Sequence, residues 1–117
     1  MRFFNEPNLE YIQDLIDRDK ENNEIFFYGI SQCYLKRRWN DYYSVKTKWF
    51  RVNNLYEFID AKEKIKSFVI EKIPECLKED ITYIDLVYYL VIKNRITDKE
   101  HKFKFDFDRI DLEGGIK

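Results

Sequence analysis

The stretch ITYIDLVYYLVIKNRITDKEHKFKFDFDRI, residues 81–110, contains the pattern that decides the fold. Its first part, residues 81–94, is too rich in β-branched and aromatic residues for a comfortable helix and is typical of a strand. In its last part, Phe103, Phe105 and Phe107 alternate with charged residues, which predicts a strand with one apolar face and one charged face. A polar connection separates these two parts, so we expect a β-hairpin.

The apolar faces of the two strands predict how they pair. If Asn94 lies opposite His101, then Ile92, Leu90 and Tyr88 share a face with the three phenylalanines. A shift of one residue would move every apolar side chain of a strand to its other face, so this agreement favours the register. The three phenylalanines are then expected in the core.

A first helix is predicted before the strands, within residues 5–23. Pro7 suits a first turn, and Asn5 or Asn8 can cap the helix. Its apolar residues recur at helical spacing. They are Leu9, Ile12, Leu15 and Ile16.

A second helix is predicted within residues 53–75. Asn54, followed three residues later by Glu57, forms a start that resembles a capping box, and Pro74 ends the helix or bends it. The residues between them predict one apolar stripe. It consists of Leu55, Phe58, Ile59, Ile65, Phe68, Val69 and Ile73.

Between the two helices, EIFFYGI (24–30) predicts a strand and CYLKRRWNDYYSVKTKWFRV (33–52) a hairpin. A two-residue turn at Asn40-Asp41 would place Lys36 opposite Val45. The order α-β-β-β-α-β-β predicts an α+β fold, an antiparallel sheet of about five strands covered on one face by two helices. We expect a single globular domain over residues 1–117, with a short loose tail from about residue 112.

Composition excludes several classes of protein. The formal net charge of −1 argues against a surface built wholly for nucleic acid. No secretory signal and no apolar run long enough to span a bilayer is present, so the cytoplasm is expected. Cys33 and Cys76 are far apart and the chain has one histidine, which gives zinc no support. We therefore expect no metal, no cofactor and no enzymatic activity.

The first predicted hairpin is a candidate binding surface. Residues 34–51 contain six basic residues against Asp41 alone, interleaved with aromatic ones. This composition suits an acidic protein partner, suits RNA or single-stranded DNA, and is also compatible with an ordinary solvated face. The candidate residues are Lys36, Arg37, Arg38, Trp39, Tyr42, Lys46 and Lys48.

Acidic residues form a second candidate surface. Asp14 and Asp17 belong to the acidic outer face predicted for the first helix, and Asp106 and Asp108 to the charged face of the last strand. Together with the basic hairpin they make the surface dipolar, and a dipolar surface orients the encounter with a complementary partner.

A catalytic interpretation rests on a set of carboxylates. Asp85 followed by Glu100-His101-Lys102 has the local form of a metal-dependent nuclease, in which an aspartate and an acidic-x-Lys pair on adjacent strands hold a divalent metal. The predicted register places Asp85 far from this triplet, and short matches of this kind occur by chance in a highly charged chain.

The stretches that carry a family resemblance are EIFFYG (24–29), which opens the sheet, LYEFIDAKEKIKSFVIEKI (55–73) in the second helix and KFKFDFDRID (102–111) in the last strand. In these stretches and in the order of its elements, the chain resembles small bacterial toxin-immunity proteins of the YezG/EsaG-like group. This resemblance implies a protein that neutralises a cognate toxin, commonly a nuclease, by covering an essential surface.

The leading hypothesis is therefore a small cytoplasmic immunity or inhibitor protein that acts by stoichiometric binding. The first alternative is a nucleic-acid-binding or phage-encoded regulatory or anti-defence protein, and the second is a metal-dependent nuclease. Binding of generic RNA or single-stranded DNA would indicate the first alternative, and magnesium-dependent cleavage the second.

Overall fold

The computed structural model of the chain describes residues 8–36 and 42–112. The elements of these residues follow one another in the order expected from the sequence, with a short 3-10 helix (η1) and a short α3 added. Their bounds are α1 Leu9–Asp17, β1 Asn23–Leu35, β2 Tyr42–Lys46, β3 Phe50–Val52, η1 Leu55–Glu57, α2 Phe58–Lys72, α3 Glu75–Lys78, β4 Ile81–Asn94 and β5 Glu100–Asp111.

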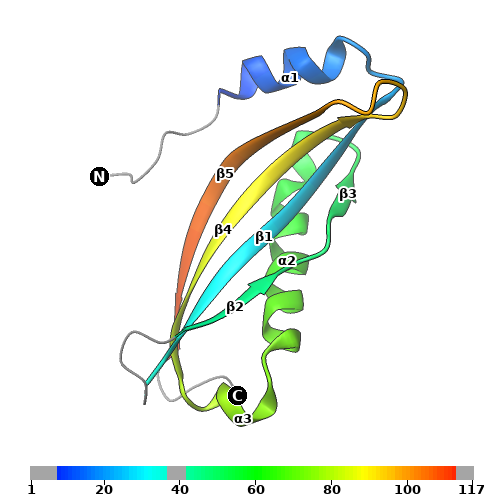
Figure 1. The fold of residues 1–117 in the computed structure, drawn as a ribbon. Helices are drawn as coiled ribbons and strands as arrows, with labels where there is room; N and C mark the ends of the chain where they lie inside the picture. Colours follow the sequence, from blue (N-terminus) through cyan, green and yellow to red (C-terminus); the bar gives the residue numbers. More distant parts are fainter. Residues whose placement is uncertain (1–7, 37–41, 113–117) are drawn as a thin grey trace.

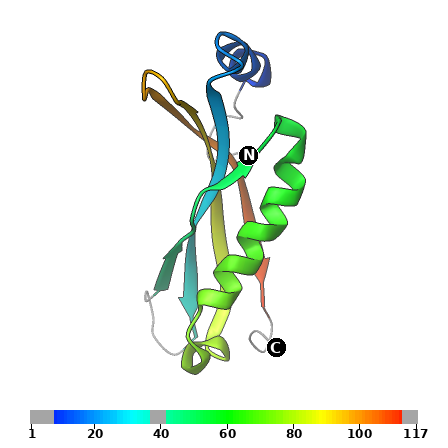
Figure 2. The same cartoon turned by 90° about the vertical axis from the view of Figure 1, so that its right-hand side faces the viewer.

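The strands form one five-stranded antiparallel sheet, which confirms the predicted α+β class. The strand order is β2-β1-β4-β5, and β3 pairs with β1 beside β2. Helix α2 runs along one face, and α1 lies across the end of the sheet near the β4–β5 turn (Figures 1 and 2). We call the opposite face, on which no described helix packs, the helix-free face.

The caps of the helices lie where the sequence predicts them. The backbone N–H of Tyr11 donates to the Asn8 side chain at the start of α1. Asn54 and Glu57 form the capping box that begins η1 and leads into α2. Helix α2 ends at Lys72, just before Pro74. One residue of the predicted apolar stripe is misplaced, since Ile59 is 72% exposed.

The first hairpin differs from its predicted form. Strand β1 is continuous over the two predicted segments, because it pairs with β4 along its whole length. Strand β2 attaches to β1 with Ser31 opposite Val45, which puts the Val45 side chain in the core. The predicted pairing of Lys36 with Val45 is therefore wrong, since it would carry Val45 to the end of the sheet. The predicted Asn40-Asp41 turn lies outside the described residues.

The register of the second hairpin also differs from the prediction. Asn94 does not pair with His101, because its side chain accepts hydrogen bonds from the backbone N–H groups of Ile96 and Thr97 and closes a tighter turn. His101 consequently lies opposite Ile92. The turn is tied to the segment after α1, since the Asn94 side chain also donates to Asp19 (Figure 1).

The core lies between the sheet and α2. Phe27 of β1 is fully buried and packs against the rings of Phe58 and Phe105. Gly29 lets the helix approach the sheet, because a Cβ at this position would lie 2.7 Å from the Ile65 side chain. No helix of the described residues is long and apolar enough to cross a membrane.

Candidate binding surface

A β-bulge in β5 determines which of its side chains face α2. Strand β5 alternates regularly from Glu100 to Lys104, which pairs with Tyr89 of β4. The neighbouring residue of β4, Tyr88, pairs with Asp106 instead of Phe105. Phe105 is therefore an extra residue, and both it and Asp106 face α2. Beyond the bulge the alternation is inverted. Phe107, predicted in the core, lies on the helix-free face, while the two aspartates predicted on the charged face lie beside α2.

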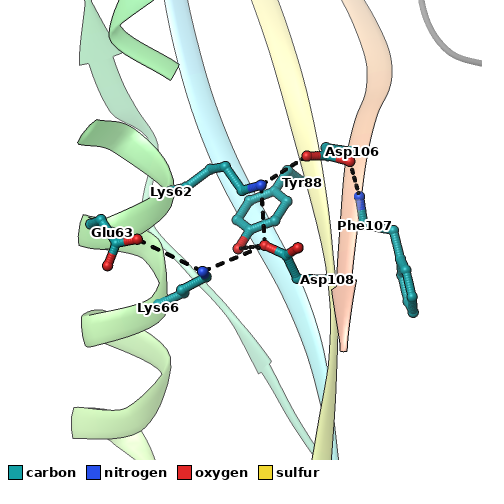
Figure 3. Close-up of polar contacts among 7 residues, drawn as sticks. All are labelled: Lys62, Glu63, Lys66, Tyr88, Asp106, Phe107 and Asp108. Atoms are coloured by element: carbon teal, nitrogen blue, oxygen red, sulfur yellow. Dashed lines mark hydrogen bonds and ion pairs between the residues drawn. The ribbon is translucent and has the colours of Figure 1, made fainter. Parts of the chain in front are cut away.

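These aspartates form an ion-pair cluster with α2, shown in Figure 3. The Lys62 ammonium lies 2.8 Å from a carboxylate oxygen of Asp106 and 3.2 Å from one of Asp108, and Lys66 lies 3.6 Å from Asp108. The hydroxyl of Tyr88, a fully buried residue, donates a hydrogen bond of 2.9 Å to Asp108. The cluster joins α2, β4 and β5 at the bulge, so it holds the inverted part of β5 in place.

Burial and hydrogen bonding shift the pKa values in this cluster. Burial raises the pKa of Tyr88, and the neighbouring Asp108 carboxylate raises it further. For Asp108, burial acts to raise the pKa, but the hydrogen bonds from Tyr88 and Lys62 outweigh it and lower the pKa below its ordinary value. For Lys62, burial acts to lower the pKa, but the two aspartates raise it. Asp108 and Lys62 are thus held in their charged forms.

Replacing Asp108 by asparagine is expected to lower the free energy of unfolding at pH 7 by about 1 to 2 kcal/mol, because the lysines lose a charged partner that is only partly exposed. Because the folded protein lowers the pKa of Asp108, the stabilisation is complete above the unfolded-state value of about 3.9 and is lost as the pH falls below it. Urea unfolding between pH 7 and pH 3 should therefore show that the free energy of unfolding falls less on acidification for Asp108→Asn than for the wild type.

The matched control is Asp14→Asn, which removes the same charge from the exposed side of α1. This variant should lose stability with falling pH as the wild type does. Parallel curves for wild type and Asp108→Asn would contradict the stabilising role of the cluster.

On the helix-free face, an aromatic row crosses the strands near the β4–β5 turn. The ring of Tyr28 stacks on Tyr89 of the neighbouring strand with the centroids 5.0 Å apart, and on Trp49 with the centroids 6.1 Å apart. The ammonium groups of Lys46 and Lys102 lie 5.6 Å from the Tyr28 centroid and 5.7 Å from the Trp49 centroid. We call Trp49, Tyr28 and Tyr89, with these two lysines, the first ladder.

A second row, the second ladder, crosses the same face toward the opposite end. The rings of Tyr34 and Tyr83 stack with centroids 4.5 Å apart, and the guanidinium of Arg109 lies 4.6 Å from the Tyr83 centroid. Asp85 holds Arg109 in this position by accepting two hydrogen bonds of 2.6 and 2.9 Å. The second ladder therefore joins β1, β4 and β5.

Stacking decides which part of each ring can contact a partner. Tyr28 lies between Trp49 and Tyr89, and Tyr83 between Tyr34 and Arg109, so the central rings have neighbours on both faces. An incoming aromatic group cannot stack on a ring face that is already covered. Tyr28 is itself buried, at 5% exposed, so the first ladder offers a partner its two lysines and the partly exposed Trp49 and Tyr89. The second ladder offers Arg109 and the partly exposed Tyr34 and Tyr83.

The structure separates the candidate residues predicted from the sequence. Of the basic hairpin, Lys46 lies on the helix-free face, whereas Lys48 lies over the Phe50 ring in a groove beside α2. Lys36 is exposed after the end of β1. The side chain of Tyr42 and all of Arg37, Arg38 and Trp39 lie outside the described residues.

The acidic candidates separate in the same way. Asp14 and Asp17 are exposed on α1, as expected for its outer face. Asp106 and Asp108 are engaged by the lysines of α2, an arrangement that does not favour a direct contact with a partner. Their role in binding stays a prediction.

The carboxylate set of the nuclease interpretation is spread along the hairpin. Asp85 pairs with Arg109, while Glu100 pairs with Lys93, eight residues further along β4. At about 3.3 Å per residue this separation is roughly 26 Å. Over residues 8–36 and 42–112, no group of three or more His, Cys, Asp and Glu side chains could hold a metal ion.

Lys46 is the ladder residue that the sequence marks as a candidate for binding, and Tyr34 and Trp49 lie within the basic and aromatic stretch 34–51. The other ladder residues are not predicted as binding candidates. Their signal is the alternation of Tyr83, Asp85, Val87 and Tyr89 in the fourth strand, which marks a second face that is neither wholly polar nor buried. The partners of these residues come from other strands, so the sequence does not reveal the stacking.

Comparison with known proteins identifies no relative: no family model, curated protein or solved structure matches the chain.

Proposed function

We propose that this chain is a small inhibitory binding protein of the immunity type, which neutralises a cognate toxin or effector in the cytoplasm by forming a stoichiometric complex. The observation that supports this proposal is the pair of ladders on the helix-free face. Stacked side chains are already ordered, so binding a partner costs them little conformational entropy. Tyrosine, tryptophan and arginine are also the residue types that dominate the energetics of protein interfaces.

The partner is expected to present an acidic surface to the first ladder. Lys46 and Lys102 are exposed above the rings of Tyr28 and Trp49, and the bulge turns Asp106 and Asp108 away from this face. Positive charge on this face is complementary to carboxylates and backbone carbonyls.

Nucleic acid is the main alternative ligand for a surface that is basic and aromatic. Proteins that bind single strands without sequence preference stack bases on open aromatic faces. On the helix-free face the faces of Tyr28 and Tyr83 are covered by neighbouring side chains. The ladders therefore favour a protein partner over a regulatory protein that binds RNA or single-stranded DNA.

The proposal is tested by capture on the immobilised protein at low salt, from an extract of the bacterium that produces it, after nuclease treatment. A single protein should be retained in a fixed molar ratio, and co-expression should suppress the toxicity of that protein. Retention of no protein under these conditions would contradict the proposal. Retention of RNA or single-stranded DNA from an untreated extract, without a protein partner, would favour the nucleic-acid alternative.

A further inference from the structure

An apolar groove lies on the helix side of the sheet, between α1 and the start of α2. It has a volume of about 440 Å³, which is within the range of ligand-binding clefts. Phe58 and Phe105 contribute core rings to its lining, and Leu9, Tyr56 and Ile59 line it from the helices. The groove and the ladders lie on opposite sides of the sheet.

The apolar side chains of the groove are far more exposed than packing of the core requires. Tyr56 is 93% exposed, Ile59 72% and Leu9 54%. The helix start beside them depends on Asn54 and Glu57, and the cap uses the backbone N–H of Tyr56 but neither the Tyr56 side chain nor Ile59. Leu9, Tyr56 and Ile59 line the same groove, so their exposed apolar surface is grouped in one place rather than scattered.

The surroundings of the groove are acidic on both sides. Residues 8–17 and 53–61 contain no lysine or arginine. Lys62, the next residue of α2, is occupied by its ion pairs with Asp106 and Asp108. The exposed acidic residues of α1 and of the first two turns of α2 are Glu10, Asp14 and Asp17 on α1, and Asp60 and Glu63 on α2.

From this arrangement we propose that the groove binds a basic amphipathic segment of a protein partner. Apolar side chains on one side of the segment enter the groove between Leu9 and Ile59, and its lysines or arginines face the acidic residues of α1 and α2. This is a second surface, separate from the ladders. Its loss therefore leaves binding through the helix-free face intact.

Fluorescence anisotropy with labelled model peptides tests this proposal. The probe is an amphipathic helix of leucine and lysine about 14 residues long, roughly four turns. The controls are a scrambled peptide of the same composition and the same helix with glutamate in place of lysine. The wild-type protein should bind the basic amphipathic peptide and neither control, and added salt should weaken the binding.

Substitutions in the protein separate docking in the groove from general attraction to its acidic surface. Ile59→Asp should weaken binding of the basic peptide by about tenfold or more, because it places a charge in the apolar contact. Attraction by charge alone would instead be strengthened by the added carboxylate. Ile96→Asp is the matched control, since Ile96 is 73% exposed in the β4–β5 turn and should have no effect.

Three results would overturn the proposal. The first is that Ile59→Asp binds the basic amphipathic peptide as tightly as the wild type does, while its circular dichroism spectrum shows that it is folded like the wild type. The second is binding that occurs only after deletion of residues 1–7, which would make the chain's own N-terminus the occupant of the groove. The third is a dimer, seen by sedimentation equilibrium, that Ile59→Asp dissociates, which would make a second copy the occupant.

Discussion

Replacing Phe27 by alanine is expected to lower the free energy of unfolding by about 3 to 5 kcal/mol, the largest single effect on stability anticipated in this fold. The side chain is fully buried in β1 and contacts the rings of Phe58 and Phe105 at centroid distances of 4.9 and 5.1 Å. Its loss leaves a cavity where the sheet, α2 and the bulge of β5 meet. Urea unfolding followed by circular dichroism measures the change.

Phe107→Ala is the matched control, because it removes the same ring from the helix-free face. Phe107 is outside the core, so its loss should cost about 1 kcal/mol or less, as for substitutions away from buried packing. If Phe107→Ala were as destabilising as Phe27→Ala, Phe107 would have to lie in the core, as regular alternation of β5 predicts. That result would contradict the bulge.

Local signals in the sequence are sufficient to predict the elements and the fold class. The caps at Asn8 and at Asn54 with Glu57 depend on residues within one helical turn, so the sequence contains all the information they need. The alternation of apolar and charged residues in 101–110 likewise identifies a strand. Order and type of the elements follow from such signals.

Strand registers depend on interactions that the local pattern does not contain. The apolar spacing of Phe103, Phe105 and Phe107 predicts a regular strand. The observed bulge places Asp106 and Asp108 where lysines of α2, more than 40 residues earlier in the chain, form ion pairs with them. Pairing between distant elements therefore outweighs the regular alternation.

The candidate surface was predictable only in part, for the same reason. The basic and aromatic composition of residues 34–51 includes Lys46, which the structure places on the helix-free face. Tyr28, Tyr83 and Tyr89 lie outside residues 34–51, in β1 and β4, and their stacking results from the sheet order. Composition indicated the kind of surface, and topology determines where it lies.

Reversing the charge of Lys46 and Lys102 together is expected to weaken binding of the protein partner by about 30-fold or more. Both ammonium groups lie above the first ladder, and neither residue forms part of the core. Glutamates at these positions would repel an acidic partner surface and would leave the rings of Tyr28 and Trp49 in place. Circular dichroism and urea unfolding should show little change in the fold.

The control for this double variant is Lys64→Glu with Lys99→Glu. Both lysines are exposed, Lys64 on α2 and Lys99 in the β4–β5 turn, and the net charge changes by the same amount. A loss of affinity caused by net charge alone would appear equally in both double variants. A loss caused by contact with the first ladder would appear only in the first.

The most direct test of binding through the helix-free face is the equilibrium affinity of the captured partner for three proteins, measured by isothermal titration calorimetry. These are the wild type, Lys46→Glu/Lys102→Glu and Lys64→Glu/Lys99→Glu. The predicted result is a one-to-one complex that the first double variant weakens by about 30-fold or more and the second leaves within about threefold of the wild type. Equal affinities for the wild type and Lys46→Glu/Lys102→Glu would contradict it.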